Sequence, residues 1–256
     1  MAIARIAAGL FHADSGPAPA GRPPLILVHG AGGTYRHWPE EVRALPGRRV
    51  IALDLSGHGG SPSPAPGTVA ALARSVLGLL DALGLETAVV AGHSMGGAVA
   101  LTLALEAPPR VAGLVLCGTG ARLRVSAAVL QATADPASLA GAADAMAQWS
   151  FGSLAGPALR REFVEGFLAN APGVVHGDFA ACDAFDVMAR LGEIRAPALV
   201  VCGSEDRLTP PKYSEHLRDH IQGARLEVVP GAGHLVMLEA PAAVARAVEA
   251  FLASLG

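Results

Sequence analysis

The sequence predicts an α/β fold, in which helices flank a mostly parallel β-sheet. Two observations support this. Short apolar runs typical of buried strands alternate with helical patterns along most of the 256 residues. The alternation stops between about residues 120 and 195, where helical stretches are broken by proline and glycine. We therefore expect a core over residues 1–120 and 196–256 and an inserted helical segment over residues 121–195.

The N-terminal part contains the first expected elements. We expect an antiparallel stretch over residues 4–13, a strand over residues 25–28, a helix over residues 37–45 and a second strand over residues 49–53. Thr68 is a typical N-cap for the next helix, since its hydroxyl can accept from the N–H groups of the first turn. Gly84 follows Leu83 as a stop signal. Another strand is expected over residues 111–117.

The junction at residues 92–97, Gly-His-Ser-Met-Gly-Gly, is the most informative motif. It lies between an apolar run at residues 87–91 and a small-residue run at residues 98–103. A Gly-x-Ser-x-Gly sequence between a strand and a helix is typical of a nucleophile elbow, in which the serine has a strained backbone. The tight turn requires small residues two positions before and after the serine, and Gly92 and Gly96 meet that requirement around Ser94.

Three further strand ends carry polar groups. The strand pattern beginning at Ala198 runs into a turn that ends with Asp206. The last strand pattern, beginning at Leu226, leads into a glycine-rich loop that contains His234. Upstream, the strand over residues 25–28 is followed by His-Gly-Ala-Gly-Gly at residues 29–33. The order serine, acid, histidine is that of a hydrolytic triad on an α/β scaffold.

Each member of this set has a chemical reason to be present. A serine hydroxyl is a weak nucleophile at neutral pH, so Ser94 needs a neighbouring base. His234 suits that role because an imidazole accepts and returns a proton near neutrality. Asp206 would orient the imidazole and stabilise the imidazolium. The Met95 N–H, at the start of a helix, would stabilise the oxyanion that forms during attack.

Other candidates are weaker. We expect His29 to brace the loop that follows its strand, His93 to flank the nucleophile, and His58 to belong to a loop turn, so that none of them acts as general base. Asp54 is the second choice for the acid, but it precedes the serine. Three aspartates on one helical stretch are expected on an exposed helix face, with no metal site, at Asp178, Asp183 and Asp186.

Together these motifs resemble those of the α/β-hydrolase fold family, in its single-domain esterase, lactonase and perhydrolase branch. The resemblance covers nearly the whole chain and rests on residues 29–32, 54–59, 92–97, 203–210 and 231–234. It implies an eight-stranded twisted sheet and makes residues 121–195 a helical cap. It also implies that the Ala31 amide is the second oxyanion donor. Gly30, Trp149 and Phe151 are expected in the substrate pocket.

Composition limits the partners and the cellular location that we expect for the protein. A net charge of −3 favours neither nucleic acid nor anionic membranes as partners. The chain shows neither an uncharged apolar run of ~18 residues nor a signal-peptide pattern. Three cysteines argue against a disulfide framework and favour a cytoplasmic location. We expect a monomer or small homo-oligomer that needs no cofactor.

The expected activity is hydrolysis of small to medium carboxylic esters through an acyl-enzyme. Several reactions share the same triad and stay open as alternatives: enol-lactone hydrolysis, cleavage of a carbon–carbon bond in ring-cleavage products, and perhydrolase or haloperoxidase activity. Enol-lactone hydrolysis would need a cationic group for a free carboxylate. A ligand-binding receptor without turnover is the alternative outside enzymes, and sustained turnover would distinguish the two.

Overall fold

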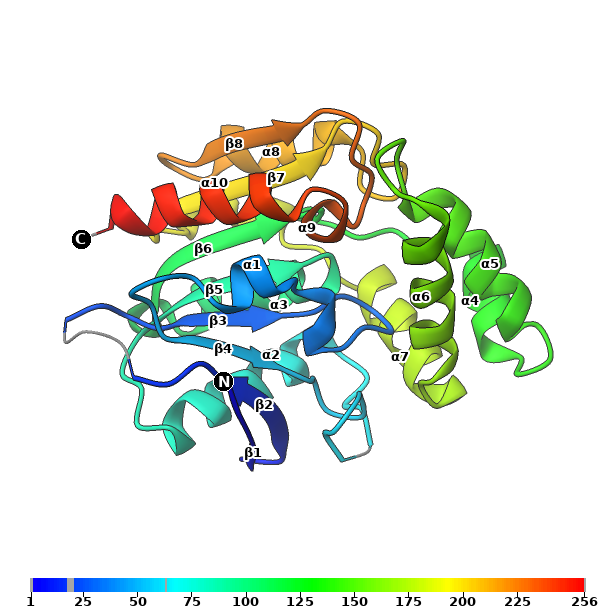
Figure 1. Ribbon diagram of the computed structural model, residues 1–256, viewed down its shortest axis with the longest axis horizontal. Coiled ribbons are helices and arrows are strands. Elements are labelled where there is room, and N and C mark those ends of the chain that lie inside the picture. Colours follow the sequence, from blue (N-terminus) through cyan, green and yellow to red (C-terminus); the bar gives the residue numbers. More distant parts are fainter. Residues whose placement is uncertain (1, 18–20, 63, 256) are drawn as a thin grey trace.

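An eight-stranded sheet runs through the middle of the molecule (Figure 1). The computed structural model describes residues 2–17, 21–62 and 64–255. Along the sheet the strand order is β1-β2-β4-β3-β5-β6-β7-β8, and all neighbours pair in parallel except β1 with β2 and β2 with β4. The strands are β1 (Ile3–Ala7), β2 (Leu10–Asp14), β3 (Leu25–Val28), β4 (Val50–Leu53), β5 (Ala88–His93), β6 (Val111–Cys117), β7 (Ala198–Gly203) and β8 (Arg225–Val229). The predicted fold class is confirmed.

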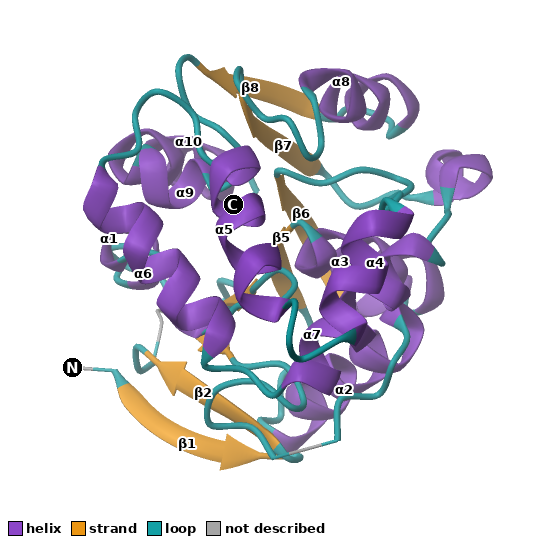
Figure 2. Cartoon of the chain, turned by 90° about the vertical axis from the view of Figure 1, so that its right-hand side faces the viewer, coloured by secondary structure: helices purple, strands orange, loops and turns teal. Residues whose placement is uncertain are grey.

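Helices cover both faces of the sheet (Figure 2). One face carries α1 (Glu40–Arg43), α9 (Val236–Glu239) and α10 (Pro241–Ala253), and the other carries α2 (Val69–Ala82), α3 (Met95–Glu106) and α8 (Pro211–His220). Because successive strand side chains point to opposite faces, Ile26 and Val28 pack with α2 and α3, whereas Leu25 and Leu27 pack with α1 and α10. Burial on both faces explains why the central strands are continuous apolar runs.

The N-terminal helices test two expectations. The Thr68 hydroxyl accepts from the Ala71 N–H at 3.2 Å and caps α2, as predicted. The continuous helix expected over residues 37–45 is wrong. A 3-10 turn, η1 (Tyr35–His37), is followed by extended backbone at Trp38 and then by the single turn of α1. Pro39 causes this break, because a proline disfavours helical geometry at the residue before it.

A group of helices stands beyond the carboxyl ends of the strands (Figure 1). It occupies the segment between β6 and β7 and contains α4 (Ala127–Ala134), α5 (Leu139–Ser150), α6 (Pro157–Leu168) and α7 (Pro172–Asp183). The short turns η2 (Pro108–Arg110) and η3 (Met188–Glu193) precede β6 and β7 respectively. We call α4 to α7 the cap. Within the described segments, no helix is long and apolar enough to cross a membrane.

Candidate active site

Ser94 lies at the sharp turn between β5 and α3. Its backbone angles are φ 52° and ψ −115°, in the left-handed half of conformational space that side chains rarely adopt. An added Cβ on Gly92 would overlap the carbonyl group of Gly96, and one on Gly96 would overlap the carbonyl oxygens of Val28 and His29. The glycines therefore permit the close approach that the elbow motif predicts.

Asp206 and His234 meet at the ends of β7 and β8. His234 Nδ1 lies 2.9 Å from Asp206 Oδ2, and both residues are almost completely buried. The Thr209 hydroxyl donates to the same oxygen at 2.9 Å, and the N–H groups of Leu208 and Thr209 donate to Oδ1. Burial acts to raise the pKa of Asp206, but the nearby His234 and these donors outweigh it and hold the pKa below its ordinary value. Asp206 is therefore a carboxylate at neutral pH.

The loop that carries His234 is fixed from several sides. The His234 N–H donates to the Ser150 carbonyl in the cap at 2.7 Å, and the His234 carbonyl accepts from His93 Nε2 at 3.0 Å. The Glu239 carboxylate accepts from Gly152 N–H in the cap at 2.8 Å and from Gly233 N–H in the loop at 2.9 Å. With Nδ1 bonded to Asp206, Nε2 is the His234 nitrogen available to Ser94.

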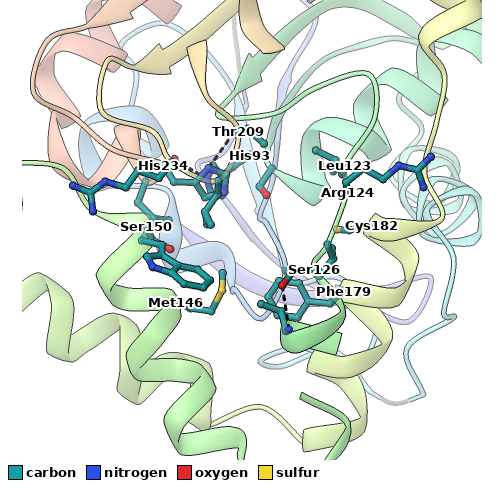
Figure 3. Close-up of a pocket in the computed structure, with 18 of the residues that line it drawn as sticks. His93, Leu123, Arg124, Ser126, Met146, Ser150, Phe179, Cys182, Thr209 and His234 are labelled. Atoms are coloured by element: carbon teal, nitrogen blue, oxygen red, sulfur yellow. Dashed lines mark hydrogen bonds between the residues drawn. The ribbon is translucent and has the colours of Figure 1, made fainter. Parts of the chain in front are cut away.

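Ser94 and His234 line one cavity of about 280 Å³ between the strand ends and the cap. His234 and Thr209 lie on the core side, and Met146, Ser126 and Phe179 lie across from them on the cap (Figure 3). Most of the wall is apolar: Leu123, Val125, Val129, Met146, Trp149, Phe163, Phe167, Phe179, Leu208 and Leu235. No aspartate or glutamate of the described chain lines it.

Two backbone N–H groups near Ser94 have no acceptor within the described part of the chain, those of Ala31 and Met95. Met95 is the first residue of α3, so its N–H lies at the positive end of the helix dipole. Ala31 lines the cavity together with Ser94. Both groups are thus free to donate to a ligand atom.

Of the three residues expected in the substrate pocket, Trp149 lines the cavity, whereas Gly30 and Phe151 do not. Trp149 lines the cavity and is 44 % exposed. Phe151 is buried away from the cavity wall, with its ring edge-on to Phe163 at a centroid distance of 5.5 Å. Gly30 is likewise absent from the wall and faces the His93 ring. The structure instead adds His37 from η1 to the lining.

His29 and Asp54 hold neighbouring loops together through hydrogen bonds. His29 Nε2 accepts from Leu55 N–H at 2.9 Å, and its Nδ1 donates to the Gly30 carbonyl, so it braces its loop as expected. Asp54 accepts from the N–H groups of Tyr35 and Gly60 rather than contacting His234. Across the described residues no group of three or more His, Cys, Asp or Glu side chains could hold a metal ion.

One expectation about the cap is wrong. Asp178 is not on an exposed helix face but is 2 % exposed, with Oδ2 at 2.7 Å from His58 Nε2 and accepting from Gly32 N–H at 2.8 Å. The acidic residue and its partner are 120 positions apart, so no local pattern could have revealed the contact. A histidine between two glycines in the loop after β4 was the available hint.

Comparisons with known proteins identify the family of the chain. The family model described as "alpha/beta hydrolase fold" matches residues 23–241. A 2-hydroxymuconate semialdehyde hydrolase from Pseudomonas putida is 33% identical over 90% of this chain and 87% of its own. The dihydrolipoyllysine-residue acetyltransferase component of the acetoin cleaving system, also from Pseudomonas putida, is 36% identical over 91% of this chain. That match spans 64% of the acetyltransferase component's own length.

Solved structures show the same likeness. A thermophilic esterase superposes with a TM-score of 0.84 at 33% identity, and the match covers 100% of this chain and 98% of the esterase. The fold, the elbow and the family match lead to one conclusion. The chain belongs to the α/β-hydrolase fold family, and it is an enzyme of the hydrolase class.

Proposed function

We propose that this protein is a serine hydrolase that cleaves carboxylic esters of small to medium apolar acids through an acyl-enzyme. One observation carries the proposal: His234, which is paired with the buried Asp206 at 2.9 Å, lines the same cavity as the strained Ser94. Nucleophile, base and orienting acid are the three parts that covalent ester hydrolysis needs.

In the proposed mechanism His234 Nε2 removes the Ser94 hydroxyl proton as the oxygen attacks the ester carbonyl. The Ala31 and Met95 N–H groups donate to the oxyanion of the tetrahedral intermediate. His234 then gives its proton to the leaving alcohol, and an acyl-Ser94 remains. Water, deprotonated by the same imidazole, attacks the acyl group and releases the acid. Asp206 stays ionised throughout and stabilises the imidazolium.

The cavity supports an apolar acyl group. Its wall is mainly aliphatic and aromatic, and the guanidinium of Arg124 points away from its interior (Figure 3). A volume of about 280 Å³ has room for a short to medium chain, and each CH₂ that leaves water contributes about 0.8 kcal/mol. We therefore expect kcat/KM to rise with chain length until the cavity is full and then to fall.

The test is steady-state turnover of p-nitrophenyl esters from acetate to decanoate. The Ser94→Ala variant should lose turnover and fluorophosphonate labelling. The matched control is Ser75→Ala, whose hydroxyl bonds only within α2 at a distance from the cavity and which should keep both. Wild-type activity that survives in Ser94→Ala would refute the proposal, and so would a single burst without turnover, which would favour a ligand-binding role.

A second candidate is an ester or enol-lactone with a free carboxylate. Arg124 and Arg207 line the cavity, and in the described part of the chain Arg207 forms no salt bridge. A carboxylate substrate would attract such a group. The comparison of adipate monomethyl ester with its dimethyl ester tests this: a preference for the monoester that Arg207→Gln abolishes would favour the second candidate.

The cellular location, the cofactor requirement and the oligomeric state are also proposed. The free cysteines Cys117, Cys182 and Cys202 are all buried, which supports a reducing, cytoplasmic location. We further propose that the protein needs no cofactor, acts on small-molecule substrates and works as a monomer or small homo-oligomer. Size-exclusion chromatography with light scattering tests the oligomeric state.

A further inference from the structure

Both sides of Gly32 are held by the cap. Its N–H donates to Asp178 Oδ2 on α7 at 2.8 Å, and its carbonyl accepts from Asn170 Nδ2 at 2.7 Å. Asn170 follows the end of α6. Gly32 is the neighbour of Ala31, whose N–H is one of the two unpaired donors beside Ser94. The cap therefore restrains the peptide next to a candidate oxyanion donor.

Asp178 is also tied to the core on its other side. His58, in the loop after β4, lies with Nε2 2.7 Å from Asp178 Oδ2, and neither side chain reaches solvent. His58 Nδ1 faces the Ser56 carbonyl at 3.2 Å, so both ring nitrogens point at acceptors, as an imidazolium requires. Burial acts to lower the pKa of His58, but the bond and charge of Asp178 outweigh it and raise the pKa above its ordinary value.

Steric contact reinforces the hydrogen bonds. Gly32 has φ +64°, and a Cβ added there would lie 3.1 Å from the Phe167 ring on α6. On its far side the same loop is bonded through His29 to Leu55 N–H. The loop that carries Ala31 is thus clamped between the cap and the segment after β4. A buried ion pair stabilises a fold only weakly compared with apolar packing, so its placement on this loop suggests a positional role.

We propose that Asp178 is a positioning residue that, together with Asn170, holds the loop of Ala31 in the geometry needed to stabilise the oxyanion. The loop that carries Ala31 then keeps this geometry only while Asp178 on α7 and Asn170 after α6 hold Gly32. This inference rests on the proposed serine hydrolase mechanism. Asp178 touches no substrate; it acts through Gly32 and Ala31.

The variants Asp178→Asn and Asp178→Ala separate the two bonds. Asparagine keeps an acceptor for Gly32 N–H and loses the charge that faces His58, whereas alanine loses both. Displacement of a catalytic group by ~1 Å lowers rates about 100-fold, so we expect Asp178→Ala to lower kcat about 10- to 100-fold with KM changed less than about threefold. Asp178→Asn should fall between alanine and the wild type. The matched control is Asp144→Asn on α5, an exposed cap aspartate that should leave kcat unchanged.

A second variant guards against misfolding of the first. Asn170→Ala removes only the donor to the Gly32 carbonyl and should lower kcat in the same sense, with KM again nearly constant. If folded Asp178→Ala and Asn170→Ala both keep kcat within about twofold of wild type, or change KM alone, the proposal is overturned.

The contact can also be followed without turnover. The backbone amide resonance of Gly32, which donates to a carboxylate, should shift in ¹⁵N-resolved NMR spectra of Asp178→Asn, and the resonance of Ala31 should shift with it. If wild-type protein hydrolyses no ester, the proposed function fails, yet these resonances still test the positioning role. An unchanged Ala31 resonance in Asp178→Asn would refute the coupling of cap and loop.

Discussion

Thr209 offers the sharpest test of the buried acid. Its hydroxyl donates to Asp206 Oδ2 at 2.9 Å, one of four donors around that carboxylate, and it is 5 % exposed. In Thr209→Val the side chain keeps its shape and loses the donor. In Thr209→Ser the hydroxyl remains, so this variant is the matched control for the loss of a methyl group.

The magnitude follows from the charge of the acceptor. A hydrogen bond to a charged group contributes about 1.5–3 kcal/mol, and three donors remain on Asp206, so we expect Thr209→Val to lower the free energy of unfolding by about 1.5 kcal/mol at pH 7. Because the pKa of Asp206 in the folded protein lies below 3.8, this stabilisation is present above pH 3.8 and is lost as pH falls through the lowered pKa. The difference between the two variants should therefore be the same at pH 7 and pH 5.

Urea unfolding of both variants at these two pH values measures the effect. Esterase kcat should fall less than about tenfold in Thr209→Val, because His234 keeps its own bond to Asp206. Equal stability of Thr209→Val and Thr209→Ser at pH 7 would refute the reasoning. A stability difference that is larger at pH 7 than at pH 5 would show that another group is responsible.

Three further predictions concern the elbow, the cavity and the buried ion pair. Gly92→Ala should lower the free energy of unfolding by about 3 kcal/mol through overpacking. Gly141→Ala, with open space around an added Cβ in α5, should not destabilise the protein. Equal melting temperatures of the two variants would contradict this prediction. Phe179→Leu should widen the cavity and move the preferred p-nitrophenyl ester towards longer chains, and an unchanged optimum would count against the assigned acyl site. The raised pKa of His58 means that its stabilisation by Asp178 is complete below pH 6.5 and is lost as pH rises through that pKa. Urea unfolding should therefore show a larger wild-type advantage over Asp178→Asn at pH 6 than at pH 9, and the reverse order would refute the ion pair.

Other titratable groups lie near His58 and Asp178. His29 is held neutral because burial, with His58 nearby, brings its pKa well below the ordinary value, and burial lowers the pKa of His37 to about 4. Burial raises the pKa of Asp54, whose carboxylate accepts the N–H groups of Tyr35 and Gly60. Burial also raises the pKa of the Cys182 thiol, with Asp178 nearby. His58, whose Nε2 lies 2.7 Å from Asp178 Oδ2, is the group to which we assign the pH dependence of this contact.

The positions of Ser94, Asp206 and His234 could be predicted because each follows an apolar run that identifies a strand by itself. Parallel strands bring their carboxyl ends to one edge of a sheet, so residues far apart in sequence meet there. The surroundings depend on contacts between distant segments. Phe151 was expected in the pocket, but it turns towards Phe163, because nothing local sets the direction of a side chain after a helix ends. Asp178 was expected in solvent because polar residues at helical spacing usually form an exposed face.

The cap does more than cover the cavity, since it bonds to both loops that face Ser94. The Ser150 carbonyl and the Gly152 N–H, which meets Glu239, join it to the loop of His234, while Asp178 and Asn170 join it to Gly32. Cap and core are therefore not interchangeable modules. A chimera that receives the cap of a relative, or a library that randomises α7, is expected to keep the present positions of the Gly32 and His234 loops only if these cross-boundary partners are exchanged as matched sets.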